Sequence, residues 1–152
     1  LIVQRAAPFA RSPRRRLVQH PKYYFFDVGV RNGLLGSFDV AGERSGPLFE
    51  QLVFSQLAAS AAATDTDLRI ASYRTEHGAE VDFIVEHDRR VWAVELKASR
   101  QVGSGDLRGL RSFADYYGRT HTPMVWCWAD APRRIDGVDV LPWQDGRRAM
   151  GL

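Results

Sequence analysis

Two short segments of the chain combine carboxylates with a lysine in a pattern that could bind a metal ion. The segments are AEVDFIVEH (79–87) and VWAVELKA (91–98), and they contain Asp82, Glu95 and Lys97. Carboxylate oxygens without histidine or cysteine favour hard ions such as Mg²⁺ or Mn²⁺. Two facing carboxylates repel each other unless a cation or a shared proton compensates their charge. The residue types therefore predict an acidic metal-binding centre, and Lys97 would supply part of the compensating charge.

A β-hairpin would bring these residues together. Both segments alternate polar and apolar residues, which predicts two strands, and a turn centred directly after Asp88 pairs Asp82 with Glu95. The same register pairs Glu80 with Lys97, so Glu80 is a supporting residue of the predicted site. Strict alternation assigns one face of the first strand to Glu80, Asp82, Ile84 and Glu86, and the other face to Val81, Phe83 and Val85.

Lysine is rare in this chain. Of the 21 lysine and arginine residues, only Lys22 and Lys97 are lysines. An ammonium is a compact point charge and a guanidinium is a planar fork, so each lysine marks a position where arginine does not serve. Lys97 also follows a run of buried-type residues at 91–94. Both observations favour the metal centre over the alternative interpretation, a solvent-facing hairpin with alternating charges.

The composition indicates one globular domain. A length of 152 residues, with 45% hydrophobic and 26% charged residues, is typical of a soluble domain with its own core. No segment approaches the roughly 18 apolar residues of a membrane span, and no signal peptide is recognisable. We therefore expect a cytoplasmic protein with no membrane partner. The single Cys127 excludes an intramolecular disulfide.

The first twenty residues are rich in proline and arginine and show little periodicity. They predict a basic arm or linker over 1–20 ahead of one domain over 21–152. Arginines in this arm are candidate contacts to a nucleic-acid backbone (Arg14, Arg15 and Arg16), and a solvated linker is the alternative. Arg74 leads into a predicted turn and could approach a phosphate. The first residue is Leu1 and not methionine, so we expect the chain to begin within a longer protein.

A long helix is predicted over 47–63. Pro47 suits its first turn, and good helix formers follow. Its apolar residues cover most of the circumference, which predicts a buried helix. Glu50 lies on an apolar face of this helix, where a carboxylate needs a partner. It is therefore a candidate site residue, or alternatively a glutamate that reaches solvent from the first turn.

The remaining pattern predicts an α/β domain. After the helix come three strands, a second helix and a further strand, with a short helix before them and an edge strand after them. The expected ranges are 68–75, 79–87 and 91–98 for the strands, 104–118 for the second helix, 123–129 for the further strand, 28–36 for the short helix and 138–143 for the edge strand. The sequence contains no GxxxxGK[ST] loop, so this chain is expected to have no ATP site of that type.

Several of these motifs together resemble a known superfamily. EVDF at 80–83, ELK at 95–97 and the helix glutamate Glu50 are similar to the motif of the PD-(D/E)XK nucleases, although Val81 stands where the name has proline. Longer segments, KYYFFDVGVRNGLLG, GPLFEQLVFSQL, YRTEHGAEVDFIVE and VWAVELKAS, resemble in the same order a C-terminal domain of unknown function. That domain is found behind AAA+-type ATPases of bacteria and archaea, and the resemblance covers about residues 12–143.

The resemblance implies a fold, a site and partners. It implies a restriction-endonuclease-like core with a mixed central sheet flanked by helices. Asp82, Glu95 and the backbone carbonyl of Leu96 would bind Mg²⁺ or Mn²⁺, Glu50 would support them, and Lys97 would act on the water or the phosphate. The implied activity is metal-dependent hydrolysis of DNA phosphodiester bonds, with an ATPase domain in cis and a homo-oligomer among the expected states. Two alternatives stay open: a catalytically silent DNA- or protein-binding module, and a regulatory domain whose carboxylates pair with arginines.

Overall fold

A single mixed sheet with helices on both faces makes up the fold. The computed structural model describes residues 3–9, 17–18, 20–40 and 42–152. The strands are β1 (Val3–Pro8), β2 (Lys22–Phe25), β3 (Arg69–Arg74), β4 (Glu80–His87), β5 (Arg90–Lys97), β6 (Thr122–Cys127), β7 (Arg133–Ile135) and β8 (Val138–Pro142). The helices are α1 (Val28–Leu34), α2 (Ser45–Ala63), α3 (Arg108–Tyr117) and α4 (Trp143–Ala149), with short 3₁₀ turns η1 (Gly42–Arg44) and η2 (Ser104–Leu107).

The strand order is β2-β1-β3-β4-β5-β6-β8-β7. Strands β3, β4 and β5 form an antiparallel meander, and β6 and β8 continue the sheet in parallel. The central elements therefore follow the expected order of helix, three strands, helix and strand, and the α/β class with a mixed sheet and flanking helices is confirmed. Strand β8 was expected at the edge of the sheet, but β7 pairs outside it and forms that edge.

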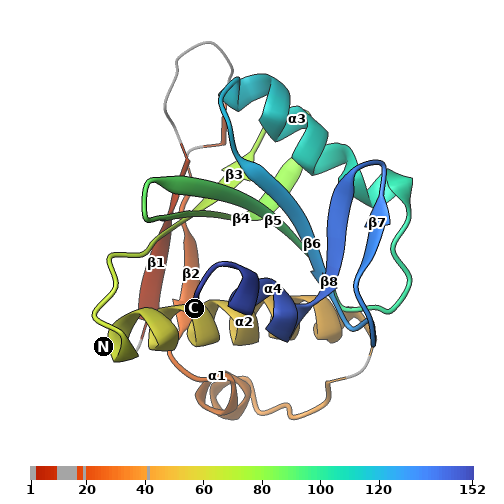
Figure 1. The fold of residues 1–152 in the computed structure, drawn as a ribbon. Helices are drawn as coiled ribbons and strands as arrows, with labels where there is room; N and C mark the ends of the chain where they lie inside the picture. The colour runs from red at the N-terminus through yellow and green to blue at the C-terminus, as the bar shows by residue number, and fades with distance from the viewer. Residues whose placement is uncertain (1–2, 10–16, 19, 41) are drawn as a thin grey trace.

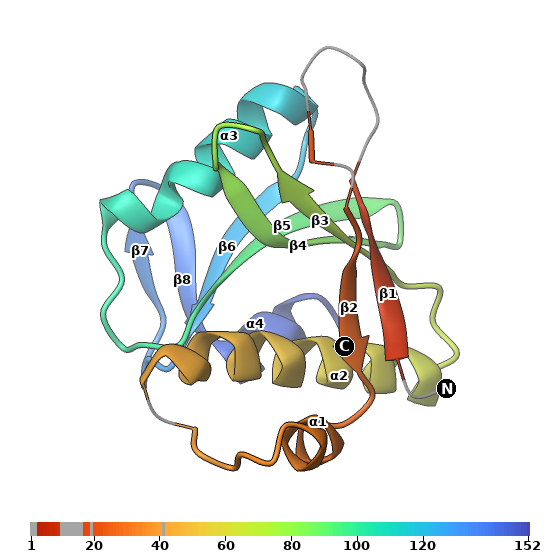
Figure 2. The same cartoon turned by 180° about the vertical axis from the view of Figure 1, so that it is seen from behind.

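Helices cover the two faces of the sheet differently (Figures 1 and 2). Figure 1 shows α2 and α4 on one face and α3 on the other. Each interface has its own hydrophobic core: Phe54 and Trp126 belong to the core against α2, and Tyr73 and Phe113 belong to the core beneath α3. The helix predicted to be buried is buried on one side only: Val53, Phe54 and Leu57 are buried, whereas Leu52 is exposed.

The β4–β5 hairpin has the predicted register. Asp88 and Arg89 both have positive φ, at 48° and 62°, as a two-residue hairpin turn requires. Pairing runs from His87–Arg90 to Phe83–Val94. Asp82 and Glu95 are the next residues on the two strands, directly beyond the last paired positions.

A β-bulge changes which residues of β4 share a face. Ala71 pairs with Ile84 and Tyr73 pairs with Val81, so one residue of β3 lies opposite two of β4. As a result Val81 and Ile84 belong to the core beneath α3, while Phe83 belongs to the core against α2. The strict alternation that we expected along β4, with Ile84 on the opposite face from Val81, is therefore wrong.

The N-terminal residues contribute to the sheet. We expected an arm or linker over 1–20, but residues 3–8 form β1, which pairs with β3 in parallel and with β2 in antiparallel orientation. Ala6 is completely buried there. Long-range pairing of this kind leaves no local periodic signal in so short a strand. The domain boundary at residue 20 stays a prediction, and the predicted contacts Arg14, Arg15 and Arg16 lie outside the described residues.

Close packing holds α3 against the start of β4. A Cβ on Gly109 would lie 1.7 Å from the carbonyl oxygen of Glu80, so only glycine permits this approach. Among the described residues, no helix is both long enough and apolar enough to cross a membrane.

Candidate functional site

One cluster of charged residues surrounds Lys22 on the side of the sheet that α2 covers. The Lys22 Nζ lies 2.8 Å from Glu50 Oε1, 2.7 Å from Glu80 Oε1 and 3.7 Å from Asp82 Oδ1. The hydroxyl of Tyr24 donates a hydrogen bond to the same oxygen of Glu50. We call Lys22, Tyr24, Glu50, Glu80 and Asp82 the Lys22 cluster. It joins three elements that are distant in sequence, namely β2, α2 and β4.

Contacts between β2 and α2 hold the Lys22 cluster together. The Gln51 side chain accepts a hydrogen bond from the Phe25 amide at 3.0 Å and donates one to the Phe25 carbonyl. One turn further along α2, Phe54 stacks on the ring of Tyr24 with centroids 4.1 Å apart. Gln51 is a buried polar residue, and its side chain ties the end of β2 to the helix. These contacts fix Glu50 opposite Lys22.

Burial and mutual repulsion shift the pKa values in this cluster. Burial, followed by the charge of Glu50, raises the pKa of Asp82 to about 6, although Lys22 and the Leu96 amide oppose the shift. Burial and the charge of Glu50 also raise the pKa of Tyr24. For Lys22, burial acts to lower the pKa, but the charges of Glu50 and Asp82 outweigh it and the pKa is raised. Lys22 is therefore firmly charged.

A second cluster surrounds Lys97 at the end of β5. The Lys97 Nζ lies 3.2 Å from Glu95 Oε1 and 3.3 Å from Asp106 Oδ1. Asp106 also accepts a hydrogen bond from the Gly103 amide at 2.9 Å, which positions it at the start of η2. We call Glu95, Lys97 and Asp106 the Lys97 cluster.

Glu95 has an oxygen with no partner. Within the part of the chain that the structure describes, its Oε2 is buried and makes no hydrogen bond. Burial, followed by the charge of Asp82, raises the pKa of Glu95 to about 8, against the opposing charge of Lys97. A buried carboxylate oxygen without a donor is costly. This oxygen therefore calls for a proton or a cation.

One backbone group connects the two clusters. Asp82 Oδ2 accepts a hydrogen bond from the Leu96 amide at 2.8 Å. Asp82 lies beyond the last paired position of the hairpin. Its side chain, and not a backbone carbonyl of β4, therefore accepts the hydrogen bond from the Leu96 amide. The structure therefore brings Glu50, Glu80, Asp82, Glu95 and Lys97 to one region. Glu80, which we expected opposite Lys97, contacts Lys22 there. The role of the Leu96 carbonyl as a metal ligand stays a prediction.

The oxygen atoms of the two clusters are of the kind that binds a hard cation. The clusters offer carboxylate oxygens, which Mg²⁺ and Mn²⁺ prefer, and the partnerless Oε2 of Glu95 adds to them. In the described ranges, however, no three histidine, cysteine or acidic residues are gathered as a ready-made metal site. The ammonium of Lys22 lies among three of the carboxylates and compensates part of their charge.

Arg74 lies beside the Lys22 cluster. Its Nε is 3.8 Å from Glu80 Oε2, and its side chain is 57% exposed. An exposed guanidinium next to the carboxylates is placed where an anionic ligand could contact it. Its role in binding a phosphate stays a prediction.

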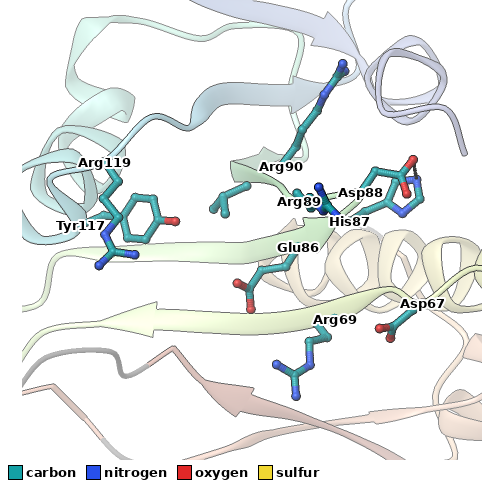
Figure 3. Close-up of a pocket in the computed structure, with 10 residues that line it drawn as sticks. Asp67, Arg69, Glu86, His87, Asp88, Arg89, Arg90, Tyr117 and Arg119 are labelled. Atoms are coloured by element: carbon teal, nitrogen blue, oxygen red, sulfur yellow. Dashed lines mark ion pairs between the residues drawn. The ribbon is translucent and has the colours of Figure 1, made fainter.

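An arginine-lined cavity lies at the other end of the hairpin (Figure 3). It has a volume of about 370 Å³ and surrounds the β4–β5 turn. Its charged lining residues are Asp67, Arg69, Glu86, His87, Asp88, Arg89, Arg90 and Arg119. In Figure 3, Glu86 lies between Arg69 and Arg119, and the ring of His87 pairs with Asp88 at 3.4 Å. None of the predicted site residues that the structure describes lines this cavity.

Sequence reasoning missed Lys22, Tyr24 and Asp106. The rarity of lysine was a usable signal, because both lysines of the chain lie among the carboxylates. Lys22 and Glu50 are 28 positions apart, so no local spacing could have linked them.

A family model matches residues 45–145 of this chain, and it describes DUF4143, a domain of unknown function. The chain belongs to the DUF4143 family. Two uncharacterized proteins, one from Mycobacterium bovis and one from Mycobacterium tuberculosis, are each 34% identical to it over 136 residues. The match covers 82% of this chain and 30% of each relative, so the chain spans about a third of their length. No solved structure gives a significant match.

The DUF4143 match does not cover the whole site. It contains every predicted carboxylate and Lys97, but β2 precedes its first residue. Lys22 and Tyr24 therefore join the site from outside the matched segment. The site of this DUF4143 chain depends on pairing between its N-terminal strands and the central sheet.

Proposed function

We propose that this DUF4143 chain is a nuclease-like domain of the PD-(D/E)XK type that hydrolyses DNA phosphodiester bonds with Mg²⁺ or Mn²⁺. The supporting observation is that Glu50, Asp82, Glu95 and Lys97, from two strands and a helix, meet at the end of the β4–β5 hairpin. A partnerless buried oxygen of Glu95 at this point favours a cation site over a set of completed ion pairs.

Each residue of the site would have its own role in the proposed hydrolysis. Asp82 Oδ1 and Glu95 Oε2 would hold the ion, together with the carbonyl of Leu96. A divalent ion in this position would lower the pKa of water and neutralise developing negative charge. Lys97, with its ammonium beside Glu95, would stabilise charge on the phosphate oxygens. Glu50, which accepts a hydrogen bond from the Tyr24 hydroxyl, would support the ion by its negative charge beside Asp82.

The ATPase partner is part of the same proposal. The chain spans 30% of each mycobacterial relative, which leaves length in those proteins for another domain. The resemblance of the KYYFFDVGVRNGLLG and GPLFEQLVFSQL segments to a domain behind AAA+-type ATPases supports such a domain in cis. Arg74, exposed beside Glu80, would contact the nucleic acid, and the arginines of residues 14–16 would add contacts from outside the described residues.

One observation favours a second candidate, a catalytically silent DNA- or protein-binding module. Lys22 already contacts three carboxylates, and no ready-made metal group exists in the described residues. A domain that had lost its metal could keep this arrangement as a structural ion-pair network.

Plasmid nicking tests the proposal. The 152-residue chain, supplied with Mn²⁺ or Mg²⁺, is expected to convert supercoiled plasmid to nicked or linear forms. An Asp82→Asn, Glu95→Gln variant should lose this activity by more than about 100-fold, because even residues that only support metal ligands contribute 10- to 100-fold. Nicking should also disappear in EDTA and return when Mn²⁺ is added in excess.

The matched control is Asp88→Asn, which removes a carboxylate from the same hairpin. Asp88 has φ of 48°, and asparagine tolerates this conformation, so its activity should equal that of the unsubstituted chain. Nicking that survives in the double variant would come from a contaminant and would contradict the proposal. No nicking by any form, with no Mn²⁺ binding by calorimetry, would favour the silent module.

A further inference from the structure

The position of Lys22 is unusual for a lysine beside a candidate metal centre. Its single ammonium lies within 4 Å of three carboxylates, those of Glu50, Glu80 and Asp82. One positive charge cannot balance three negative ones. Arg74 adds only a long contact to Glu80, 3.8 Å away, from an exposed position. The cluster therefore keeps an excess of negative charge that a divalent cation would neutralise better.

We infer that Lys22 is a displaceable counter-ion, whose ammonium compensates the charge of Asp82 and its two neighbouring glutamates and leaves them when the divalent cation binds to Asp82 and Glu95. The inference rests on the proposed function in one respect, since it concerns the same metal centre. It assigns a role to Lys22 that neither the family model nor the uncharacterized relatives supply. In this role the lysine keeps the carboxylates assembled before the ion arrives.

The geometry permits the exchange. The Lys22 side chain is 26% exposed, so it reaches the cluster from the solvent side and is not enclosed by it. Lysine carries its charge on a flexible four-carbon stem, and β2 is the outermost strand of its side of the sheet. The ammonium can therefore swing away without moving the backbone of β4 or α2.

The remaining contacts explain why the carboxylates would stay in place. Glu50 keeps its hydrogen bond from Tyr24 when Lys22 leaves, and Asp82 keeps the one from the Leu96 amide. Glu50 and Asp82 thus each have a neutral donor in addition to Lys22, and Glu80 keeps its contact with Arg74 at 3.8 Å. Guanidinium would bind the carboxylates in a rigid fork, which is a physical reason for lysine at this position in a chain dominated by arginine.

Chemical acetylation of the unsubstituted chain tests the exchange directly. An ammonium held by three carboxylates reacts slowly with an acylating reagent, and a released one reacts faster. We expect the acetylation rate of Lys22, followed by mass spectrometry, to rise at least about threefold when Mn²⁺ is added. A single-lysine reference peptide in the same tube corrects for reagent, and NaCl at the same ionic strength should cause no rise. An unchanged or slower rate at Lys22 would overturn the inference.

Metal affinity gives an independent measurement. If the ammonium competes with the cation, Lys22→Met should bind Mn²⁺ at least about tenfold more tightly by calorimetry, since it removes a like charge about 4 Å from the ion. Arg134→Met is the control, because it removes a positive charge from an exposed pair with Asp139, and its affinity should be unchanged. Equal or weaker binding by Lys22→Met would overturn the inference.

The two measurements separate the inference from the proposed function. If the unsubstituted chain binds Mn²⁺ but acetylation of Lys22 does not change, the metal centre stands and the displaceable counter-ion is wrong. If neither the unsubstituted chain nor Lys22→Met binds Mn²⁺, both fail, and Lys22 is a permanent structural partner. The acetylation measurement needs no substitution, so it decides the matter even where Lys22→Met does not fold.

Discussion

The Lys22 cluster and the Lys97 cluster balance buried negative charge in different ways. In the Lys22 cluster one ammonium contacts Glu50, Glu80 and Asp82 directly. In the Lys97 cluster the ammonium contacts one oxygen of Glu95, and the other oxygen is buried with no hydrogen-bond partner among the described residues. The first cluster uses the charge of a lysine that stays protonated, and the second relies on a proton, since the pKa of Glu95 is raised to about 8. The carboxylates are thus held close together, but their negative charge is not fully compensated.

The largest expected effect is the difference between the two lysines in how much their replacement lowers the free energy of unfolding. Lys22→Met should lower the free energy of unfolding by about 2–4 kcal/mol, because three part-buried carboxylates lose their shared partner. Lys97→Met should cost only about 1 kcal/mol, because Glu95 can stay protonated and Asp106 keeps the Gly103 amide. Urea unfolding at pH 7 in EDTA measures both. Equal losses would show that the two clusters compensate their negative charge in the same way.

Neutralising one glutamate in each cluster should have opposite effects. The folded-state pKa of Glu95 is raised, so its contribution to stability is present at low pH and is lost as the pH rises through about 8. Glu95→Gln should therefore raise the free energy of unfolding by about 1–2 kcal/mol at pH 8.5 and leave it nearly unchanged at pH 5. Glu50→Gln should lower it by about 1–2 kcal/mol at pH 7, because it weakens the bonds from Lys22 and Tyr24.

Unfolding curves across this pH range provide the measurement. The slope of stability against pH between 5 and 8.5 should flatten in Glu95→Gln and keep a part that belongs to Asp82, whose pKa is raised to about 6. A slope that stays unchanged in Glu95→Gln would mean that Glu95 is ionised in the folded state. That outcome would remove the difference between the clusters.

The smallest effect is expected at the edge of the Lys97 cluster. The hydrogen bond from the Gly103 amide, together with Lys97, lowers the pKa of Asp106, so its contribution is present at neutral pH and is lost as the pH falls through the lowered value. Asp106→Asn should cost about 0.5 kcal/mol at pH 7, as an exposed ion pair does. Guanidinium chloride would mask this pair by screening, so the urea midpoint is the appropriate readout. A loss as large as that of Lys22→Met would place Asp106 at the centre of the cluster.

Local patterns predicted the part of the site that one hairpin carries. The two-residue turn at Asp88 and Arg89 set the register, and this brought Asp82 and Glu95 to the same end of the hairpin. The helix over 47–63 and its glutamate were also predictable, because propensity and the Pro47 signal agree there. Each of these features depends on residues that are near in sequence.

The remainder depends on contacts between distant residues. Strand β1 pairs with β3 across more than sixty positions, and nothing in six residues of mixed character indicates that partner. The bulge in β4 arises from its pairing with β3, so alternation within β4 could not reveal it. Lys22 meets Glu50 only because Gln51 ties β2 to α2. The assignments to a metal, a nucleic acid and an ATPase stay predictions.

The strand that carries Lys22 also limits where a shortened form of this protein can begin. A fragment that begins at residue 45, where the family match starts, would retain all four central carboxylates but lose β1, β2 and their lysine. Its β3 would become an exposed edge with unpaired backbone groups, which invites aggregation. Its carboxylates would repel one another, and no lysine ammonium from β2 would compete with a cation for them. A cation titration on such a fragment would therefore measure a less stable domain that lacks Lys22, and its result would not represent the charge balance of the 152-residue chain.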